Sequence, residues 1–326
     1  MILILTSHGD HSSDQVIDWL NHYGYRHYRI NDDDLFSKDK LNINISKDML
    51  GKITHEHADI NKATVGWFRK FGLYKDAYFH DTSGKLLDGN LSDYFLCEFT
   101  AVTNAIFDSL SQNLNWLCDP GKAISLSKIK QLIYAAKAGL DIPESLITNN
   151  HLSARQFIDK HTGIGLIKPV GESEAVGYKR ALYFFSPKLL LSSILQSLKQ
   201  KSFFPSLIQE YLDKDIELRI FYLDRTCYPM AIFSQLDERT KIDFRDYNET
   251  KPNRFVPYIL PETITDQINV FMESVGLNTG SIDMVKTKSG RYVFLEVNPK
   301  GQFGMVSNPC NYYLEEKVAL SLIAKS

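Results

Sequence analysis

Residues 294–298 constrain the fold most, because this apolar segment reads as a strand yet carries two polar side chains, Glu296 and Asn298. Alternate residues of a strand project from the same face, so the carboxylate and the carboxamide lie side by side. Hard oxygen ligands of this kind suit Mg²⁺. The segment therefore predicts a strand with its apolar face in a core and its polar face at a metal site. An exposed hairpin with solvated acids explains the strand equally well when the strand is considered alone.

A second acidic strand precedes this one. Asp283 lies in the apolar segment 280–285. Mg²⁺ usually binds one or two carboxylates together with substrate phosphates. We therefore expect Asp283, Glu296 and Asn298 to hold Mg²⁺ against a triphosphate.

Composition limits the classes of function. The chain has 326 residues, 44% of them hydrophobic and 23% charged, which is ordinary for a globular protein of two or three domains. A net charge of −2 without a basic stripe gives no reason to expect a nucleic-acid partner. No apolar run approaches the roughly 20 residues that span a bilayer, and residues 1–6 read as a first strand, not as a signal peptide. The four scattered cysteines are typical of a reduced, cytoplasmic protein.

The periodicity predicts an α/β protein in three parts. The first part, residues 1–120, reads as an open α/β domain that ends in the turn residues Asp119-Pro120-Gly121. Its expected elements are strands at 2–5, 25–30 and 65–71 and helices around 16–20 and 94–110.

The second part spans residues 121–205 and the third spans residues 206–326. In the second part we expect a helix at 121–140, strands at 164–168 and 181–185, and a turn-rich loop at 171–177. The third part is rich in strands, expected at 207–211, 217–222, 230–233, 282–286 and 292–297, with one helix at 262–275.

Two lysines of the second part are candidates for binding phosphate. Lys168 ends an apolar strand directly before Pro169, and Lys128 lies early in the preceding helix. The amides of loop 171–177, which is bounded by glycines, are further candidates, although its two glutamates repel phosphate unless they point outward. Each lysine taken alone is more often a plain surface charge.

Residues 209–212 are candidates for binding a nucleotide base. Gln209, Glu210, Tyr211 and Leu212 read as a strand leaving its sheet, which can present main-chain groups to an adenine edge. A simple exposed strand end is the alternative.

Acids alternate with arginines in two later segments. Glu217 and Arg219 share a strand face, where the carboxylate suits ribose hydroxyls and the guanidinium suits a phosphate or a carboxylate. A cross-strand ion pair worth about 0.2–1 kcal/mol is the alternative. Asp243 and Arg245 repeat the pattern.

In this order the residues resemble the ATP-grasp superfamily. The matching residues are Lys128, Gly139, Pro143, Lys168-Pro169, Gln209-Glu210-Tyr211, Glu217-Leu218-Arg219, Asp283 and Leu295-Glu296-Val297-Asn298-Pro299. Within the superfamily the chain is similar to the graspetide synthetases, which include the microviridin ligases, and most of all to the grasp-with-spasm maturases. That likeness rests on residues 65–70, 117–120, 214–219, 234–235, 240–245 and 294–302, and it extends over nearly the whole chain.

The resemblance implies a fold and a set of ligands. Residues 1–120 would form a pre-ATP-grasp domain, and residues 121–205 and 206–326 would form two subdomains that clasp ATP, the second with an antiparallel sheet. ATP and Mg²⁺ are the implied cofactors. The implied roles are α/β-phosphate binding by Lys128 and Lys168, adenine binding by Gln209–Leu212, ribose binding by Glu217, and contacts of Arg219 and Arg245 with the γ-phosphate and the acceptor carboxylate.

The resemblance also implies an activity. The enzyme would activate Asp or Glu side chains of a ribosomal precursor peptide, made of a leader and a core, as acyl phosphates. It would then join them to Ser/Thr hydroxyls or Lys amines of the same peptide. Asp243 is our candidate for the base that deprotonates the hydroxyl, with orientation of Arg245 as its alternative role.

Partners and alternative functions complete the expectations. The candidate peptide contacts are Trp67, Phe68, Arg69 and segment 237–246. The alternatives are ordinary packing for the three residues and a solvated hairpin for the segment. A homodimer is implied by likeness. An ATP-grasp ligase that adds an amino acid to a protein or small peptide, and a non-catalytic ATP-binding module, are the alternative functions.

Overall fold

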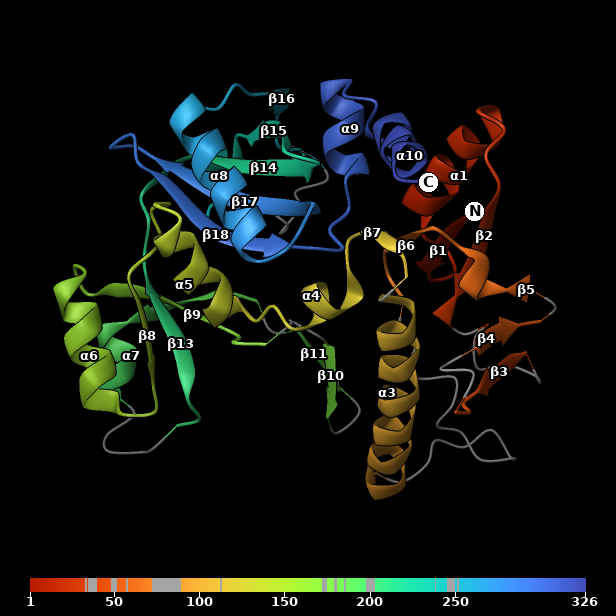
Figure 1. Cartoon of the computed structure of the whole chain (residues 1–326). Coiled ribbons are helices and arrows are strands. Elements are labelled where there is room, and N and C mark those ends of the chain that lie inside the picture. Colours follow the sequence, from red (N-terminus) through yellow and green to blue (C-terminus); the bar gives the residue numbers. More distant parts are fainter. Residues whose placement is uncertain are drawn as a thin grey trace.

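The computed structural model describes residues 1–32, 34, 40–47, 52–56, 58–71, 89–111, 113–171, 175–178, 181–184, 186–197, 203–237, 239–244, 250 and 252–326. Three larger sheets organise these residues, and each is covered by helices (Figure 1). None of the described helices is long and apolar enough to cross a membrane.

The first large sheet is parallel and has the order β2-β1-β6-β7. Its strands are β1 (Ile2–Thr6), β2 (His27–Asn31), β6 (Val65–Phe68) and β7 (Asn115–Leu117). A small antiparallel sheet beside it contains β3 (Leu41–Asn44), β4 (Lys52–His55) and β5 (Ala58–Asp59), followed by the 3-10 turn η1 (Ile60–Lys62).

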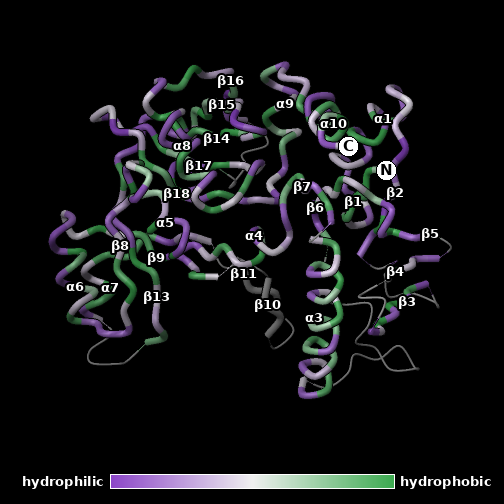
Figure 2. Tube along the Cα trace, in the orientation of Figure 1, coloured by the Kyte–Doolittle hydropathy of each residue, from purple (hydrophilic) through white to green (hydrophobic). Residues whose placement is uncertain are grey.

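Side chains of β1 alternate between two cores, as a strand covered on both faces requires. Ile2 and Ile4 pack with α1 (His11–His22) and with α10 (Leu314–Ala324), so the last helix of the chain covers the first sheet. On the opposite face, Leu3 and Leu5 pack with α3 (Gly89–Ser111). Hydrophobic and hydrophilic residues alternate along α3 (Figure 2).

The second large sheet is antiparallel and has the order β12-β9-β13-β8. Its strands are β8 (Ser145–Thr148), β9 (Ile164–Lys168), β12 (Lys188–Leu191) and β13 (Ser206–Glu210). Helices α6 (His151–Lys160) and α7 (Ser192–Ser197) pack on it through a small core around Ile158 and Leu195.

The third large sheet is antiparallel and has the order β16-β15-β14-β17-β18. Its strands are β14 (Lys214–Leu223), β15 (Thr226–Ile232), β16 (Phe255–Pro257), β17 (Thr279–Thr287) and β18 (Tyr292–Asn298). Helices α5 (Lys128–Lys137) and α8 (Glu262–Ser274) cover one face, and α9 (Gly304–Cys310) packs on the other. The 3-10 turn η2 (Ser234–Leu236) follows β15.

The helix predicted at 121–140 is two helices. Asp119 caps α4 (Pro120–Ile124) by accepting from the Lys122 amide at 3.0 Å, so Pro120 begins a helix where a turn was expected. Ser127 then accepts from the Lys130 amide at 3.3 Å and begins α5. Gly139 has a φ of +85°, in the left-handed region that ends helices.

Two other predictions need correction. Residues 175–178 extend the expected phosphate loop into a strand, β10 (Ala175–Tyr178). This strand pairs antiparallel with β11 (Ala181–Phe184), with Gly177 opposite Leu182. Residues 172–174 lie outside the described part. The expected peptide contacts Trp67, Phe68 and Arg69 are at most 3% exposed, so they serve packing.

Candidate functional site

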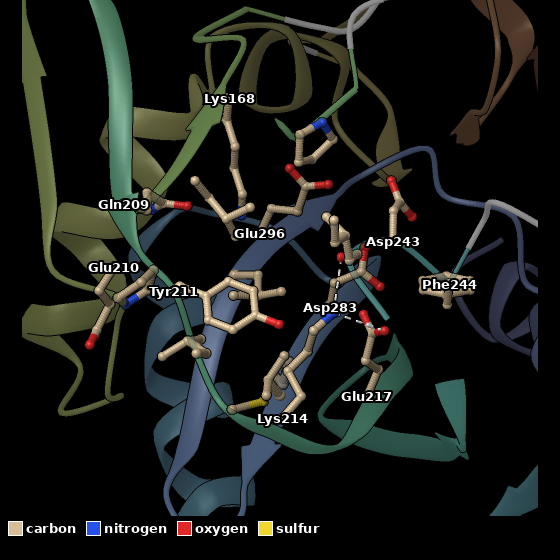
Figure 3. A pocket seen from close by; sticks show the side chains of 18 of the residues that line it. Lys168, Gln209, Glu210, Tyr211, Lys214, Glu217, Asp243, Phe244, Asp283 and Glu296 are labelled. Atoms are coloured by element: carbon tan, nitrogen blue, oxygen red, sulfur yellow. Dashed lines mark hydrogen bonds and ion pairs between the residues drawn. The ribbon is translucent and has the colours of Figure 1, made fainter. Parts of the chain in front are cut away.

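A pocket lies between the second and third sheets and encloses about 980 Å³, part of it open to solvent (Figure 3). Most of the expected site residues line it, although Arg219 does not. The expected residues that line it are Lys128, Lys168, Gln209, Glu210, Tyr211, Leu212, Glu217, Asp243, Asp283 and Glu296. Arg245 lies outside the described residues.

Lys168 projects into the pocket from the end of β9 and lies next to Glu296 (Figure 3). Burial lowers the pKa of its amine to about 8, and the charges of Lys128 and Lys214 act in the same direction. Glu296 and Asp243 oppose the shift. Because burial is the main cause of this shift, an anion bound next to Lys168 would favour the charged form of its amine.

Lys128 approaches the pocket from the first residue of α5. Its Nζ lies 3.5 Å from the carbonyl oxygen of Pro169 and 3.7 Å from Glu296 Oε2. The N-terminus of a helix carries partial positive charge, which adds to that of the lysine. Lysines from two elements thus face the same space.

Glu217 and Lys214 form a buried pair at the opposite end of the pocket (Figure 3). Lys214 Nζ lies 3.1 Å from Glu217 Oε1 and donates to the carbonyl of Ile242 at 3.0 Å. Burial raises the pKa of Glu217, while Lys214 and the Ser234 hydroxyl, which donates at 2.6 Å, lower it. These two contacts hold the Glu217 carboxylate in place at the wall of the pocket.

Asp283 and Glu296 lie directly opposite one another on β17 and β18. Like charges placed opposite each other destabilise a sheet unless cations neutralise them. Arg219 Nη1 donates to both oxygens of Asp283 at 2.7 Å, and Lys128 lies beside Glu296. Two carboxylates kept together in this way suit a divalent cation.

Asn298 does not line the pocket as expected, because β18 ends there. Its side-chain oxygen accepts from the Lys300 amide at 3.0 Å, within the turn that follows the strand. The described residues contain no group of three or more His, Cys, Asp or Glu side chains that could hold a metal ion. The donors present fit Mg²⁺ whose remaining ligands are phosphate oxygens and water.

Residues 209–212 connect the two sheets that enclose the pocket. Gln209 donates to the Ser145 hydroxyl at 2.9 Å, and Glu210 accepts from the Glu144 amide at 3.0 Å, so both side chains join β13 to its neighbour. Tyr211 and Leu212 then cross to β14. Main-chain groups and apolar surfaces are what this connection offers a ligand.

Sequence reasoning missed part of the lining. The lining residues that were given no site role are Pro143, Leu166, Pro169, Pro187, Lys214, Leu218, Met284, Val285 and Leu295, while Ile242 and Phe244 belong to the candidate peptide-contact segment 237–246. Lys214 is the important omission, since the register shift between Lys214 and Ile216 turns it toward the pocket. The signal available in the sequence was the spacing of Lys214 and Glu217, a basic and an acidic residue three positions apart.

Comparison with known proteins identifies the fold. No family model and no curated protein sequence matches the chain. A RiPP-associated ATP-grasp ligase of Chryseobacterium gregarium, solved with ADP and a leader and core peptide, matches with a TM-score of 0.84 at 24% identity, covering 100% of this chain and 97% of that one. The macrocyclase MdnC of Microcystis aeruginosa MRC, solved with precursor peptide MdnA, gives 0.82 at 25% identity, with 99% and 100% covered.

A third structure agrees with these two. The ATP-grasp ligase PsnB, solved with a minimal precursor, Mg and ADP, gives a TM-score of 0.78 at 19% identity, covering 99% of this chain and 96% of that one. The chain therefore has the ATP-grasp fold, and the predicted fold class is confirmed. It is similar over its whole length to a macrocyclase and to ligases of this fold.

Proposed function

We propose that the chain is an ATP-dependent, ADP-forming ligase that crosslinks a ribosomally made precursor peptide. It activates Asp or Glu side chains of the peptide and joins them to Ser/Thr hydroxyls or Lys amines of the same peptide. The observation that carries the proposal is the pocket of Lys128, Lys168, Asp283 and Glu296. It lies in a fold shared end to end with a macrocyclase and with a RiPP-associated ligase.

The nucleotide would span the pocket. Lys128 and Lys168 supply positive charge for its phosphates, and Glu217 supplies acceptors for the ribose hydroxyls. Residues 209–212 would hold adenine through main-chain groups and apolar surfaces. We divide the chain accordingly into residues 1–120, 121–205 and 206–326, so that the second and third parts clasp the nucleotide.

Asp283 and Glu296, which line the pocket, would hold Mg²⁺. When bound, Mg²⁺ neutralises phosphate charge and orients the terminal phosphate. Arg219 donates to both oxygens of Asp283, and we assign its guanidinium to the γ-phosphate and the carboxylate of the peptide.

The chemistry has two steps. A carboxylate oxygen of the peptide attacks the γ-phosphorus of ATP, the bond between this phosphorus and the bridging oxygen breaks, and ADP leaves with the electron pair. A hydroxyl or amine of the peptide then attacks the acyl carbon, and phosphate leaves. Phosphoryl transfer needs mainly positioning and charge neutralisation, which Arg219 and Arg245 supply.

The second step needs a group that takes the proton of the hydroxyl. Asp243 lines the pocket, and its charge acts on both Lys168 and Glu217. These relations support our assignment of Asp243 as the base, with orientation of Arg245 as the alternative role.

The test is to incubate the protein with ATP, Mg²⁺ and candidate precursor peptides encoded near its gene. We expect each crosslink to remove the mass of one water from the peptide, with one phosphate released. A gain of mass would show instead that two molecules are joined. Unchanged peptide masses without phosphate release would contradict catalysis and leave a nucleotide-binding module.

A further inference from the structure

The turn that follows β18 accepts hydrogen bonds from Arg69, a residue next to the first sheet that lies 231 positions before Lys300 in the sequence. Arg69 follows β6, and its Nη1 donates to the carbonyl oxygens of Lys300 and Gly301, the latter at 2.8 Å. In Figure 1 the chain leaving β18 runs toward β6 and β7. One guanidinium thus joins the first sheet to the segment directly after the metal-binding strand.

The guanidinium of Arg69 is itself held in place. Its side chain is 3% exposed, and its Nε lies 3.3 Å from Oδ2 of Asp10, which is 1% exposed. The group also lies over the ring of Phe303, at 5.3 Å from the centroid. Arg69 therefore presents its donors to the turn in one orientation.

The turn transmits this orientation to Asn298. The Gly301 amide donates to the Asn298 carbonyl at 3.0 Å, and the Lys300 amide donates to the Asn298 side-chain oxygen at 3.0 Å. The hydroxyl of Ser281 on β17 donates to the Gln302 carbonyl at 3.1 Å. A Cβ on Gly301 would lie 2.4 Å from the Ser281 Cβ, so the turn fits only with glycine at this position.

We propose that Arg69 is a positioning residue for the Mg²⁺ site, acting through the turn 299–301 on the end of β18, the strand that carries Glu296. The inference rests on the proposed function and extends it, since a residue of the first sheet then sets the geometry of a metal ligand on the third. Groups that orient metal ligands typically affect metal affinity by 10–100-fold when they are removed. Arginine suits the task because its rigid, planar guanidinium keeps Nη1 directed at both carbonyls while Nε lies beside Asp10, which a lysine ammonium does in no fixed geometry.

The test compares ADP binding by calorimetry in Mg²⁺ and in EDTA, on the full chain, for the wild type and Arg69→Lys. We expect the gain in ADP affinity on adding Mg²⁺ to fall about tenfold in the variant, while affinity in EDTA stays unchanged. Arg29→Lys is the matched control, because Arg29 lies on β2 of the same sheet and pairs with Asp14 of α1, away from the turn. It should keep the wild-type gain.

The outcomes separate this inference from the proposed function. A wild type whose ADP affinity does not respond to Mg²⁺ refutes the proposed function. An Arg69→Lys protein with the full gain, or with equal losses in Mg²⁺ and EDTA, refutes the positioning role alone. If this variant does not fold, Ser281→Ala tests the turn instead, since it removes the contact to Gln302 without changing a charge, and an unchanged gain there would refute transmission through the turn.

Discussion

Two arginine–carboxylate pairs in this molecule have the same chemistry and different surroundings. Asp283 lines the pocket and pairs with Arg219; their side chains are 19% and 11% exposed, and a second carboxylate, Glu296, lies directly opposite Asp283. The side chains of Arg69 and Asp10 are only 3% and 1% exposed. Asp10 also accepts a hydrogen bond from the Ser13 hydroxyl and forms an ion pair with Lys70. The open pair leaves acidic groups facing a cavity, whereas the enclosed pair has satisfied its carboxylate internally. The surroundings of an arginine–carboxylate pair, and not the pair itself, thus indicate whether it belongs to a ligand-binding site.

The largest effect is expected at the open end. Glu296→Gln should reduce ATP turnover about a thousandfold, as loss of a key electrostatic group in an active site does. Its side chain faces the pocket, so the melting temperature should change little. Phosphate release and thermal unfolding check both points, with Glu144→Gln, an exposed glutamate, as control. Full turnover in the variant would show that Glu296 is not a ligand.

The enclosed pair should respond in stability instead. Burial opposes ionisation of Asp10, but Arg69, Ser13 and Lys70 together hold the pKa of Asp10 below its ordinary value. Such a group stabilises the fold above its unfolded-state pKa of about 3.9, and the contribution is lost as pH falls through the folded-state pKa.

Asp10→Asn should therefore lower the free energy of unfolding by about 3 kcal/mol at pH 7, because it leaves Arg69 without its charge partner. The difference from the wild type should shrink in acid. Denaturant titration at several pH values measures this, with Asp14→Asn, whose side chain is half exposed, as control. A constant difference down to the acid limit would contradict the assignment.

The smallest effect concerns the charge that the pocket offers to phosphate. The pKa of Lys168 is about 8, so its amine is charged below that pH and loses its proton as pH rises through it. Affinity for ADP should accordingly fall by about tenfold between pH 7 and pH 9, a difference of roughly 1.4 kcal/mol. Lys168→Gln should bind more weakly and without this dependence, while Lys288→Gln, far more exposed, keeps it. An unchanging wild-type affinity would exclude Lys168 as a phosphate ligand.

Much of the pocket was predictable from sequence because its residues lie on strands with regular alternation. Glu217 and Arg219 share a face of β14, and Asp283 and Glu296 meet in register on β17 and β18. Lys214 escaped prediction because a register shift, which no pattern in the sequence announces, turns it inward. The contact of Arg69 with Lys300 depends on packing between distant segments, so alternation alone could not reveal it.

The packing of α10 against α1 has a consequence for synthesis. The helix formed by residues 314–324 completes the core under β1, so a chain still on the ribosome lacks one cover of its first sheet. Pairing between segments so far apart slows folding and leaves apolar surface open in the meantime. The first sheet thus gains this cover only after residues 314–324 have been made, and a fragment cut after residue 120 would lack that helix.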